Sequence, residues 1–262
     1  MASFKALFKT KPLIGMIHLL PLPGSPDYAG SMDEILAAAM DDLGALERGG
    51  ADSFIIENFG DVPYSCENEP ITLAAMTKIS ALIARETKLP FGVNVQFNCT
   101  EQEWALAYAV DADYIRVEAF VENRVGKHGV TYATAPSLMR LRGRYPAKTM
   151  IFADINTKHT FPLVEQPTDF SVHEAIESGA DALIITGLLT GQSPRSEDLE
   201  EIKALAGGVP VLLGSGVDER NAAEFYAVAD GAIIGSSIKK DGNVFNRVDE
   251  QRVRRLAQVI KG

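Results

Sequence analysis

The sequence has few cysteines and no long apolar stretch, and both scarcities narrow the class of protein. Its 262 residues include two cysteines, Cys66 and Cys99, too few for a disulfide framework. No segment approaches the roughly 18 consecutive apolar residues of a membrane span. Residues 1–11 contain no apolar core of signal-peptide length. We therefore expect a cytoplasmic protein with no integral membrane segment.

Basic charge is scarce as well. The chain has 25 Lys and Arg against 35 Asp and Glu, which gives a net charge of −10. Nucleic-acid binding depends on clustered Lys and Arg. The two basic clusters here, 140–144 and 252–255, have the spacing of solvated helix faces. These features argue against a nucleic-acid partner.

A short repeat is the most informative feature that is present. The tripeptide Gly-Ala-Asp, or a close variant, stands four times before a short apolar run and ends at Asp52, Asp113, Asp181 and Asp230. A supersecondary unit that recurs about every 60 residues indicates a barrel built from four doubled βα units.

Strand and helix patterns alternate along the whole chain. Apolar runs bounded by Gly, Pro or Asp predict strands near 13–18, 53–57, 91–96, 113–118, 149–154, 182–186, 210–214 and 231–235. Helical patterns lie near 31–48, 70–87, 101–110, 136–143, 171–178, 196–206, 219–227 and 247–260. No Gly-x-Gly-x-x-Gly follows the first strand, so an open dinucleotide-binding sheet is disfavoured. We predict an α/β fold, a (β/α)8 TIM barrel, as one domain over residues 1–262.

Polar side chains stand where the predicted strands end, and barrel active sites lie at that end. The candidates for acid–base catalysis are Asp154, Glu57, His18, Lys158, His159 and Glu118, and those for substrate binding are Asn94, Arg116 and Thr186. Asp154 is expected to pair with Lys158 or His159. Counting five residues from each repeated aspartate gives Glu57, Glu118, Thr186 and Gly235, which predicts one layer around the barrel mouth. The alternative is that these polar groups only pair with one another and with loop amides.

The last two strands end in small residues. These are Gly214, Ser215 and Gly216, and then Gly235, Ser236 and Ser237. Barrel phosphate sites are often formed by the loops after strands seven and eight together with a short extra helix. We predict a phosphate site here and a short helix from Ser236; the alternative is that the glycines only make tight turns.

Other features bear on the chemistry. No lysine lies within a predicted strand, which disfavours a Schiff-base aldolase, although Lys158 follows Asp154 in a loop at the barrel mouth. No cofactor is indicated with certainty, and a divalent metal held by Glu57, Asp154, Glu118 and a histidine stays open without a fixed ligand spacing. The segments 119–135 and 187–192 are interpreted as lids.

Residues 11–26 resemble the opening signature of the BtpA/SgcQ family. Further matching segments are 57–61, 92–95, 153–159, 186–191, 214–217 and 235–242, so the resemblance runs in register to about residue 255. It implies a barrel related to the ribulose-phosphate-binding group. The family is named for a role in photosystem I biogenesis, although members occur in organisms without photosynthesis. The resemblance implies no particular activity.

The chain departs from the family pattern at three places. Phe97-Asn98-Cys99 follows strand three where a basic residue and Asn-Asp are usual, Glu118 replaces Asn, and Lys127-His128-Gly129 replaces Asp-Gln-Gly. These departures are expected to face the part of the ligand that is not phosphate.

The leading hypothesis is an enzyme of isomerase, epimerase or lyase type that acts on a small phosphorylated sugar or nucleotide-like compound. The alternatives are a non-catalytic assembly or ligand-sensing factor, and a metal-dependent hydrolase or nucleosidase. A homo-oligomer is left open.

Overall fold

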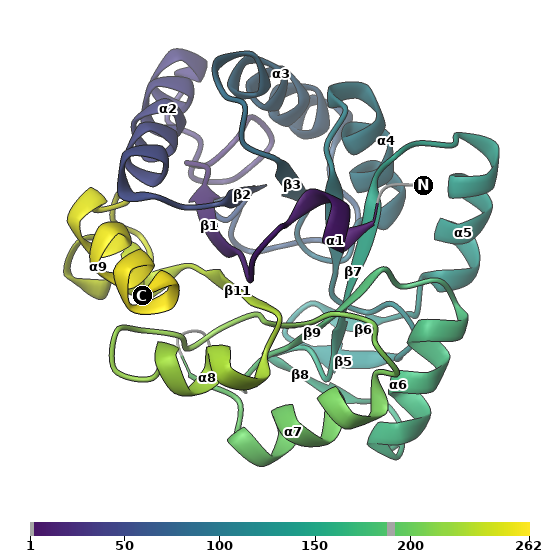
Figure 1. Ribbon diagram of the computed structural model, residues 1–262. Helices are drawn as coiled ribbons and strands as arrows, with labels where there is room; N and C mark the ends of the chain where they lie inside the picture. Colours follow the sequence, from purple (N-terminus) through teal and green to yellow (C-terminus); the bar gives the residue numbers. More distant parts are fainter. Residues whose placement is uncertain (1–2, 188–191) are drawn as a thin grey trace.

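Eight parallel strands close into a ring in the computed structural model, which describes residues 3–187 and 192–262 (Figure 1). They are β1 (Leu13–His18), β2 (Ser53–Glu57), β3 (Phe91–Asn94), β4 (Tyr114–Val117), β7 (Met150–Ile155), β9 (Ala182–Ile185), β10 (Val211–Leu213) and β11 (Gly231–Ile234). Neighbours in the ring follow the order β1-β11-β10-β9-β7-β4-β3-β2. The predicted TIM barrel is confirmed, and each strand lies within one or two residues of its predicted ends.

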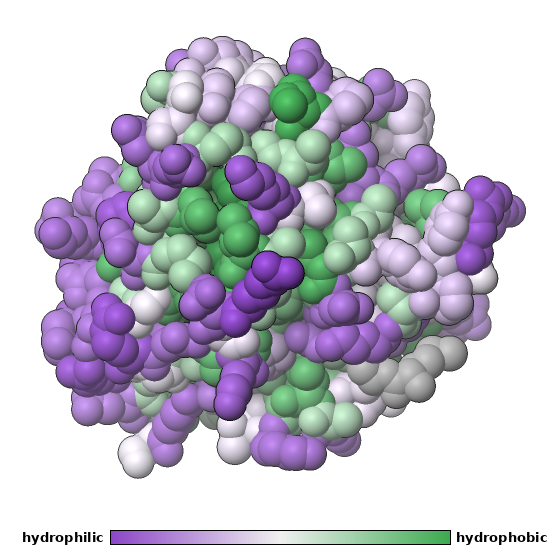
Figure 2. Space-filling model, turned by 90° about the horizontal axis from the view of Figure 1, so that it is seen from above, coloured by the Kyte–Doolittle hydropathy of each residue, from purple (hydrophilic) through white to green (hydrophobic). Residues whose placement is uncertain are grey.

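Helices surround this ring. They are α2 (Met32–Gly49), α3 (Pro70–Glu86), α4 (Thr100–Val110), α5 (Ala135–Arg144), α6 (Thr168–Glu177), α7 (Ser196–Leu205), α8 (Ala222–Val228) and α9 (Glu250–Lys261). Ser31 caps α2 as its spacing predicts, since its Oγ accepts the backbone N–H of Glu34 at 3.2 Å. Seen from above, after a 90° turn from the view of Figure 1, hydrophilic side chains surround a smaller hydrophobic patch (Figure 2). Among the described residues, no helix has both the length and the apolar character to cross a membrane.

The four repeated aspartates share one structural role at the amino-terminal end of the barrel. Each stands before one strand, and its carboxylate accepts a backbone N–H at the start of the strand that precedes it in the chain. The donors to Asp52, Asp113, Asp181 and Asp230 are Leu13, Phe91, Ile151 and Val211, at 2.9, 3.1, 2.9 and 2.7 Å. Each carboxylate also pairs with a cation, namely Lys261, Lys148, Arg142 and Lys203 in the same order. We call these contacts the aspartate clamps.

Removing one clamp is expected to loosen the barrel. In Asp230→Ala, the Val211 N–H loses its side-chain acceptor, and a buried donor without a partner costs about 1–3 kcal/mol. The free energy of unfolding in urea measures this loss. Asp41→Ala on the exposed face of α2 is the matched control and should change little. Equal effects of the two substitutions would contradict the role of the clamps.

A short helix closes the amino-terminal end of the ring. α1 (Phe4–Leu7), which is absent from the sequence prediction, lies across the centre of the barrel in Figure 1. The Phe4 ring lies 5.9 Å from Phe152, and the Phe8 ring lies 6.4 Å from Tyr114. These aromatic side chains belong to a buried apolar cluster inside the barrel. The opposite, carboxyl-terminal end is therefore the one available for a ligand.

A small antiparallel sheet lies outside the barrel. It contains β5 (Arg124–Gly126), β6 (Gly129–Thr131) and β8 (Thr160–Pro162) in the order β6-β5-β8. The buried Arg124 connects it to the barrel, because its Nη1 donates at 2.9 Å to Oδ1 of Asn156, the residue that directly follows β7. The predicted lid segment 119–135 thus contains an ordered hairpin. The second predicted lid, 187–192, lies mostly outside the described residues.

Candidate active site

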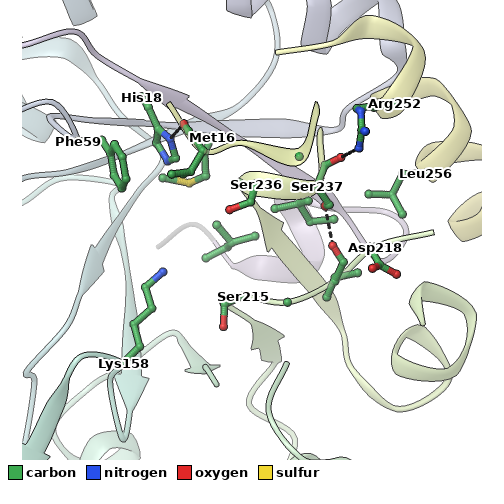
Figure 3. A pocket seen from close by; sticks show the side chains of 18 of the residues that line it. Met16, His18, Phe59, Lys158, Ser215, Asp218, Ser236, Ser237, Arg252 and Leu256 are labelled. Carbon is green, nitrogen blue, oxygen red and sulfur yellow. Dashed lines mark hydrogen bonds between the residues drawn. The ribbon is translucent and has the colours of Figure 1, made fainter. Parts of the chain in front are cut away.

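A cavity of about 480 Å³ opens at the carboxyl-terminal end of the barrel (Figure 3). It brings together many of the residues predicted from the strand ends. The predicted residues that line it are His18, Glu57, Arg116, Lys158, Gly214, Ser215, Gly216, Gly235, Ser236 and Ser237. Of the four residues predicted to form one layer around the barrel mouth, Glu57 and Gly235 line the cavity, and Glu118 and Thr186 do not.

Glu57 and His18 form one wall of the cavity, because β1 and β2 pair in a register that sets the two residues side by side. Burial raises the pKa of the Glu57 carboxyl group, although Lys158, Arg116 and a 2.9 Å hydrogen bond from Gln96 oppose the shift. Burial also lowers the pKa of His18 well below its usual range, and the charge of Lys239 adds to this. A carboxyl group with a raised pKa and an imidazole with a lowered pKa therefore face the same cavity.

The orientation of His18 defines which ring nitrogen is a base. Its Nδ1 lies 3.4 Å from the carbonyl oxygen of Val244, which can only accept a hydrogen bond, so the ring proton belongs on Nδ1. The other nitrogen, Nε2, lies 4.0 Å from Glu57 Oε2. Phe59 stacks on the imidazole at 4.2 Å between ring centroids and fixes the plane of the ring. Nε2 is thus left as an acceptor beside Glu57.

Lys158 extends into the cavity from the segment that follows β7 (Figure 3). Its Nζ has no hydrogen bond or ion pair with the described residues. Burial lowers the pKa of Lys158 to about 8, and the positive charge of Arg116 lowers it further. The negative charges of Glu57, Asp154 and Glu118 act in the opposite direction. Its side chain therefore loses its proton at a pH closer to neutral than that of a solvated lysine, whose pKa is about 10.4.

Arg116 crosses the barrel interior and takes a partner that the sequence did not predict. Its Nε donates to Asp154 Oδ1 at 3.0 Å, and its Nη2 donates to Asp154 Oδ2 at 2.9 Å. Thr157 donates a further 2.9 Å hydrogen bond to the same carboxylate. Both members of the pair are buried. The expected pairing of Asp154 with Lys158 or His159 is therefore wrong as to partner, and Asp154 lies behind Arg116 rather than on the cavity surface.

Gly214 makes room for this pair. A Cβ built on Gly214 would lie 2.5 Å from Ile184 Cγ2 and 3.1 Å from the Nη2 of Arg116. A larger residue at the end of β10 would therefore displace the guanidinium from the barrel interior. The glycine serves the arginine as well as the turn.

Glu118 and Asn94 lie beside the cavity and are used by the scaffold. Asn94 donates 2.9 Å hydrogen bonds to the Arg116 carbonyl and to Glu118 Oε1. Glu118 Oε2 accepts the backbone N–H of Asn98 at 3.1 Å. Burial raises the pKa of Glu118 to about 7. These contacts hold the ends of β3 and β4 together. For Asn94 and Glu118, the alternative that polar groups at strand ends pair with one another and with loop amides therefore agrees with the structure.

Two further predicted residues are also outside the cavity lining. Thr186 lies with its Oγ1 3.5 Å from the Asn156 carbonyl oxygen, a long and weak contact. His159 is exposed and has a left-handed φ of 62°. Burial lowers its pKa, and Lys158 and Lys127 contribute to the shift.

The three serines of the predicted phosphate site differ in what their hydroxyl groups contact. Ser215 Oγ accepts from Gly187 N at 3.0 Å and donates to the Gln192 carbonyl at 2.8 Å. Ser237 Oγ donates to the Val217 carbonyl at 2.6 Å. Ser236 begins a short 3-10 helix, as predicted, and its hydroxyl makes no hydrogen bond with the described residues. It points toward the cavity in Figure 3, so Ser236 supplies the hydroxyl that is available to a ligand.

Arg252 is a cavity residue that the sequence interpretation missed. The cluster 252–255 was expected to be a solvated helix face, and this is correct for Arg254 and Arg255, which are exposed. Arg252, however, lines the cavity and donates to the Ser237 carbonyl at 3.2 Å. A cation in the first turn of a helix opposes the helix dipole. That placement in α9 is the signal that distinguishes Arg252 from its neighbours.

The three departures from the family pattern contact one another. The rings of Phe97 and His128 stack at 4.0 Å, and Asn98 bonds to Glu118 as described above. None of these residues lines the cavity. Their expected contact with the part of the ligand that is not phosphate stays a prediction. Among the described residues there is also no group of three or more His, Cys, Asp or Glu side chains arranged to hold a metal ion.

Comparison with known families assigns this geometry to a group of proteins. The BtpA family model matches residues 9–262. The chain belongs to the BtpA family. An uncharacterised BtpA-type relative from Pyrococcus abyssi is 39% identical over 258 residues and covers 96% of both chains. The photosystem I biogenesis protein BtpA of Synechocystis is 35% identical over 255 residues, covering 97% of this chain and 89% of its own.

Solved structures place the BtpA fold among TIM-barrel enzymes. Thiamine phosphate pyrophosphorylase from Pyrococcus furiosus superposes with a TM-score of 0.62 at 16% identity, covering 97% of each chain. Tryptophan synthase of Mycobacterium tuberculosis gives a TM-score of 0.62 at 17% identity, covering 97% of this chain and 93% of its own. Phosphoribosyl anthranilate isomerase from Thermococcus kodakaraensis gives 0.58 at 14% identity, covering 96% and 99%. At these identities the likeness shows the shared fold alone.

Proposed function

We propose that the protein is an enzyme that uses acid–base chemistry on a small phosphorylated sugar or nucleotide-like compound. The observation that carries this proposal is the convergence of Glu57, His18 and Lys158 on one cavity whose other wall is formed by the two serine-containing turns. The names of two barrels with the same fold, thiamine phosphate pyrophosphorylase and phosphoribosyl anthranilate isomerase, refer to phosphorylated compounds, which supports the same substrate class by analogy.

The phosphate would bind on the side of β10 and β11. The segments 214–216 and 235–237 bring small residues and main chain to the cavity surface, and Arg252 adds a cation behind them. Backbone N–H groups, a free serine hydroxyl and a guanidinium are suitable partners for a phosphate. Ser236 is the residue proposed to contact it through its side chain.

The acid and the base would come from the opposite wall. Glu57 has a raised pKa and suits the donor of a proton, whereas the Nε2 of His18 suits the acceptor. Arg116 is proposed to contribute fixed positive charge, and Asp154 is proposed to act as the positioning residue for that arginine. Four other predicted site residues do not line the cavity and are not proposed to contact the ligand directly: Asn94, Glu118, His159 and Thr186.

Thermal shift with matched ligands tests the phosphate site. Ribose 5-phosphate and dihydroxyacetone phosphate should stabilise the protein, and ribose and dihydroxyacetone should not, because binding to the folded state raises its stability. Ser236→Asp places a carboxylate against the phosphate and should weaken binding at least about tenfold. Ser236→Ala removes the hydroxyl contact but keeps the main chain and adds no charge, so it should weaken binding less than Ser236→Asp. Equal stabilisation by the unphosphorylated compounds would refute the phosphate site.

A second candidate function rests on one relative. The Synechocystis protein is named for photosystem I biogenesis, so a non-catalytic assembly or ligand-sensing role is the alternative for this chain. Both roles are compatible with a ligand-binding cavity. They differ in turnover, because a sensing factor releases its ligand unchanged.

A further inference from the structure

We propose that the Lys158 amine forms an imine with the carbonyl carbon of a small phosphorylated aldehyde or ketone held in this cavity. The proposal rests on the proposed function, since the phosphate is what would bring the carbonyl group to the lysine. It narrows the substrate class from phosphorylated compounds in general to those that present a carbonyl group.

The position of Lys158 carries the argument. Its Nζ points into the cavity from the wall that faces the serine-containing turns, with Ser236 between it and Arg252 in the view of Figure 3. A phosphate bound on the turns would therefore leave the rest of the molecule directed toward the amine. The Nζ has no carboxylate or carbonyl partner among the described residues, so no contact must be broken before it reacts.

The surroundings of Lys158 increase the fraction of its side chain that is a neutral amine. Burial lowers the pKa of Lys158 to about 8, and the guanidinium of Arg116 adds to the effect. A desolvated lysine beside a second cation is a known way to keep a nucleophilic amine unprotonated at neutral pH. No lysine lies within a barrel strand, but Lys158 reaches the cavity from the segment that follows β7.

The neighbouring groups balance the protons of the step. The Nζ lone pair forms the C–N bond, the carbonyl π pair moves to oxygen, and that oxygen takes the proton of Glu57. His18 Nε2 accepts a proton from the new ammonium nitrogen, which gives a neutral carbinolamine. The imidazolium then returns that proton to the hydroxyl group, water leaves, and the nitrogen lone pair forms the C=N bond. The products are an iminium ion, the Glu57 carboxylate and one water.

Reductive trapping tests the imine. The full-length protein is incubated with dihydroxyacetone phosphate or glyceraldehyde 3-phosphate and sodium cyanoborohydride, and its peptides are analysed by mass spectrometry. We expect a secondary-amine adduct at Lys158 at a level at least about tenfold above that at Lys78, an exposed lysine on α3. Trapping should rise as the pH passes upward through about 8, where the amine becomes neutral.

Lys158→Arg separates imine formation from phosphate binding, because arginine keeps a positive charge and forms no such imine. The variant should lose the adduct and retain thermal stabilisation by the phosphorylated probe. Stabilisation of the native protein without an adduct at Lys158 would overturn the imine and leave the proposed phosphate site intact. Absence of both would overturn both proposals. An equal adduct yield from unphosphorylated dihydroxyacetone would support the imine and overturn the phosphate site.

Discussion

Asp154→Ala is expected to destabilise the protein by about 3–5 kcal/mol. The substitution leaves the Arg116 guanidinium buried at 4% exposure without the carboxylate that accepts two of its hydrogen bonds. Removing one partner of a buried ion pair costs this much because the remaining charge is uncompensated. Urea unfolding, with the dependence on denaturant checked for a constant slope, measures the change.

Two further variants test the cause of this loss. Arg116→Met combined with Asp154→Ala removes both charges and should recover a large part of the lost stability. Asp198→Ala breaks the solvent-facing pair of Asp198 with Arg195 on α7 and should have a much smaller effect. If the double variant is as unstable as Asp154→Ala alone, the loss of stability does not come from the unpaired charge of Arg116.

Gly216→Ala is expected to cost at least about 2 kcal/mol of stability and to abolish binding of phosphorylated ligands. Gly216 has a φ of 75°, which costs L-residues about 1–2 kcal/mol. A Cβ there would also lie 2.1 Å from the backbone nitrogen of Ser193, so the turn and segment 192–193 must move apart. The absence of a side chain at Gly216 therefore allows segment 192–193 to approach the turn closely.

Gly208→Ala is the matched control for this prediction. Gly208 also has a positive φ, of 97°, but a Cβ built on it meets nothing within 4 Å. It therefore carries the backbone cost without the collision. Urea unfolding and thermal shift with ribose 5-phosphate should separate the two variants. If Gly216→Ala binds the ligand as Gly208→Ala does, the turn is not part of the phosphate site.

The barrel was predictable because its units repeat and each carries its own boundary signals. Seven of the eight barrel strands are short apolar runs that directly follow Pro or Asp. Helix α2 shows both its Ser31 cap and its terminal Gly50 with a φ of 90°. The elements missed are those stabilised by distant parts of the chain. α1 has four residues and depends on Phe152, and β5 pairs with β8, which lies more than 30 residues further along.

The rim of the site was predictable and the roles of its residues were not. Strand ends indicate which side chains reach the mouth of a barrel, and His18, Glu57, Arg116 and Lys158 are all there. Whether a polar group faces a ligand or a neighbour depends on contacts between different strands. Asp154 accepts hydrogen bonds from Arg116, and Glu118 accepts them from Asn94 and Asn98. The spacing of these residues in the sequence does not predict either contact.

The aspartate clamps and the cavity lie at opposite ends of the same strands. The carboxylates that connect consecutive strands therefore lie at the amino-terminal end of the barrel, away from a ligand bound in the cavity. The residues that depart from the family pattern, among them Phe97, Glu118 and His128, follow the carboxyl-terminal ends of β3 and β4 and take no part in the four clamps. Substitutions of residues that line the cavity are therefore expected to leave all four clamps in place.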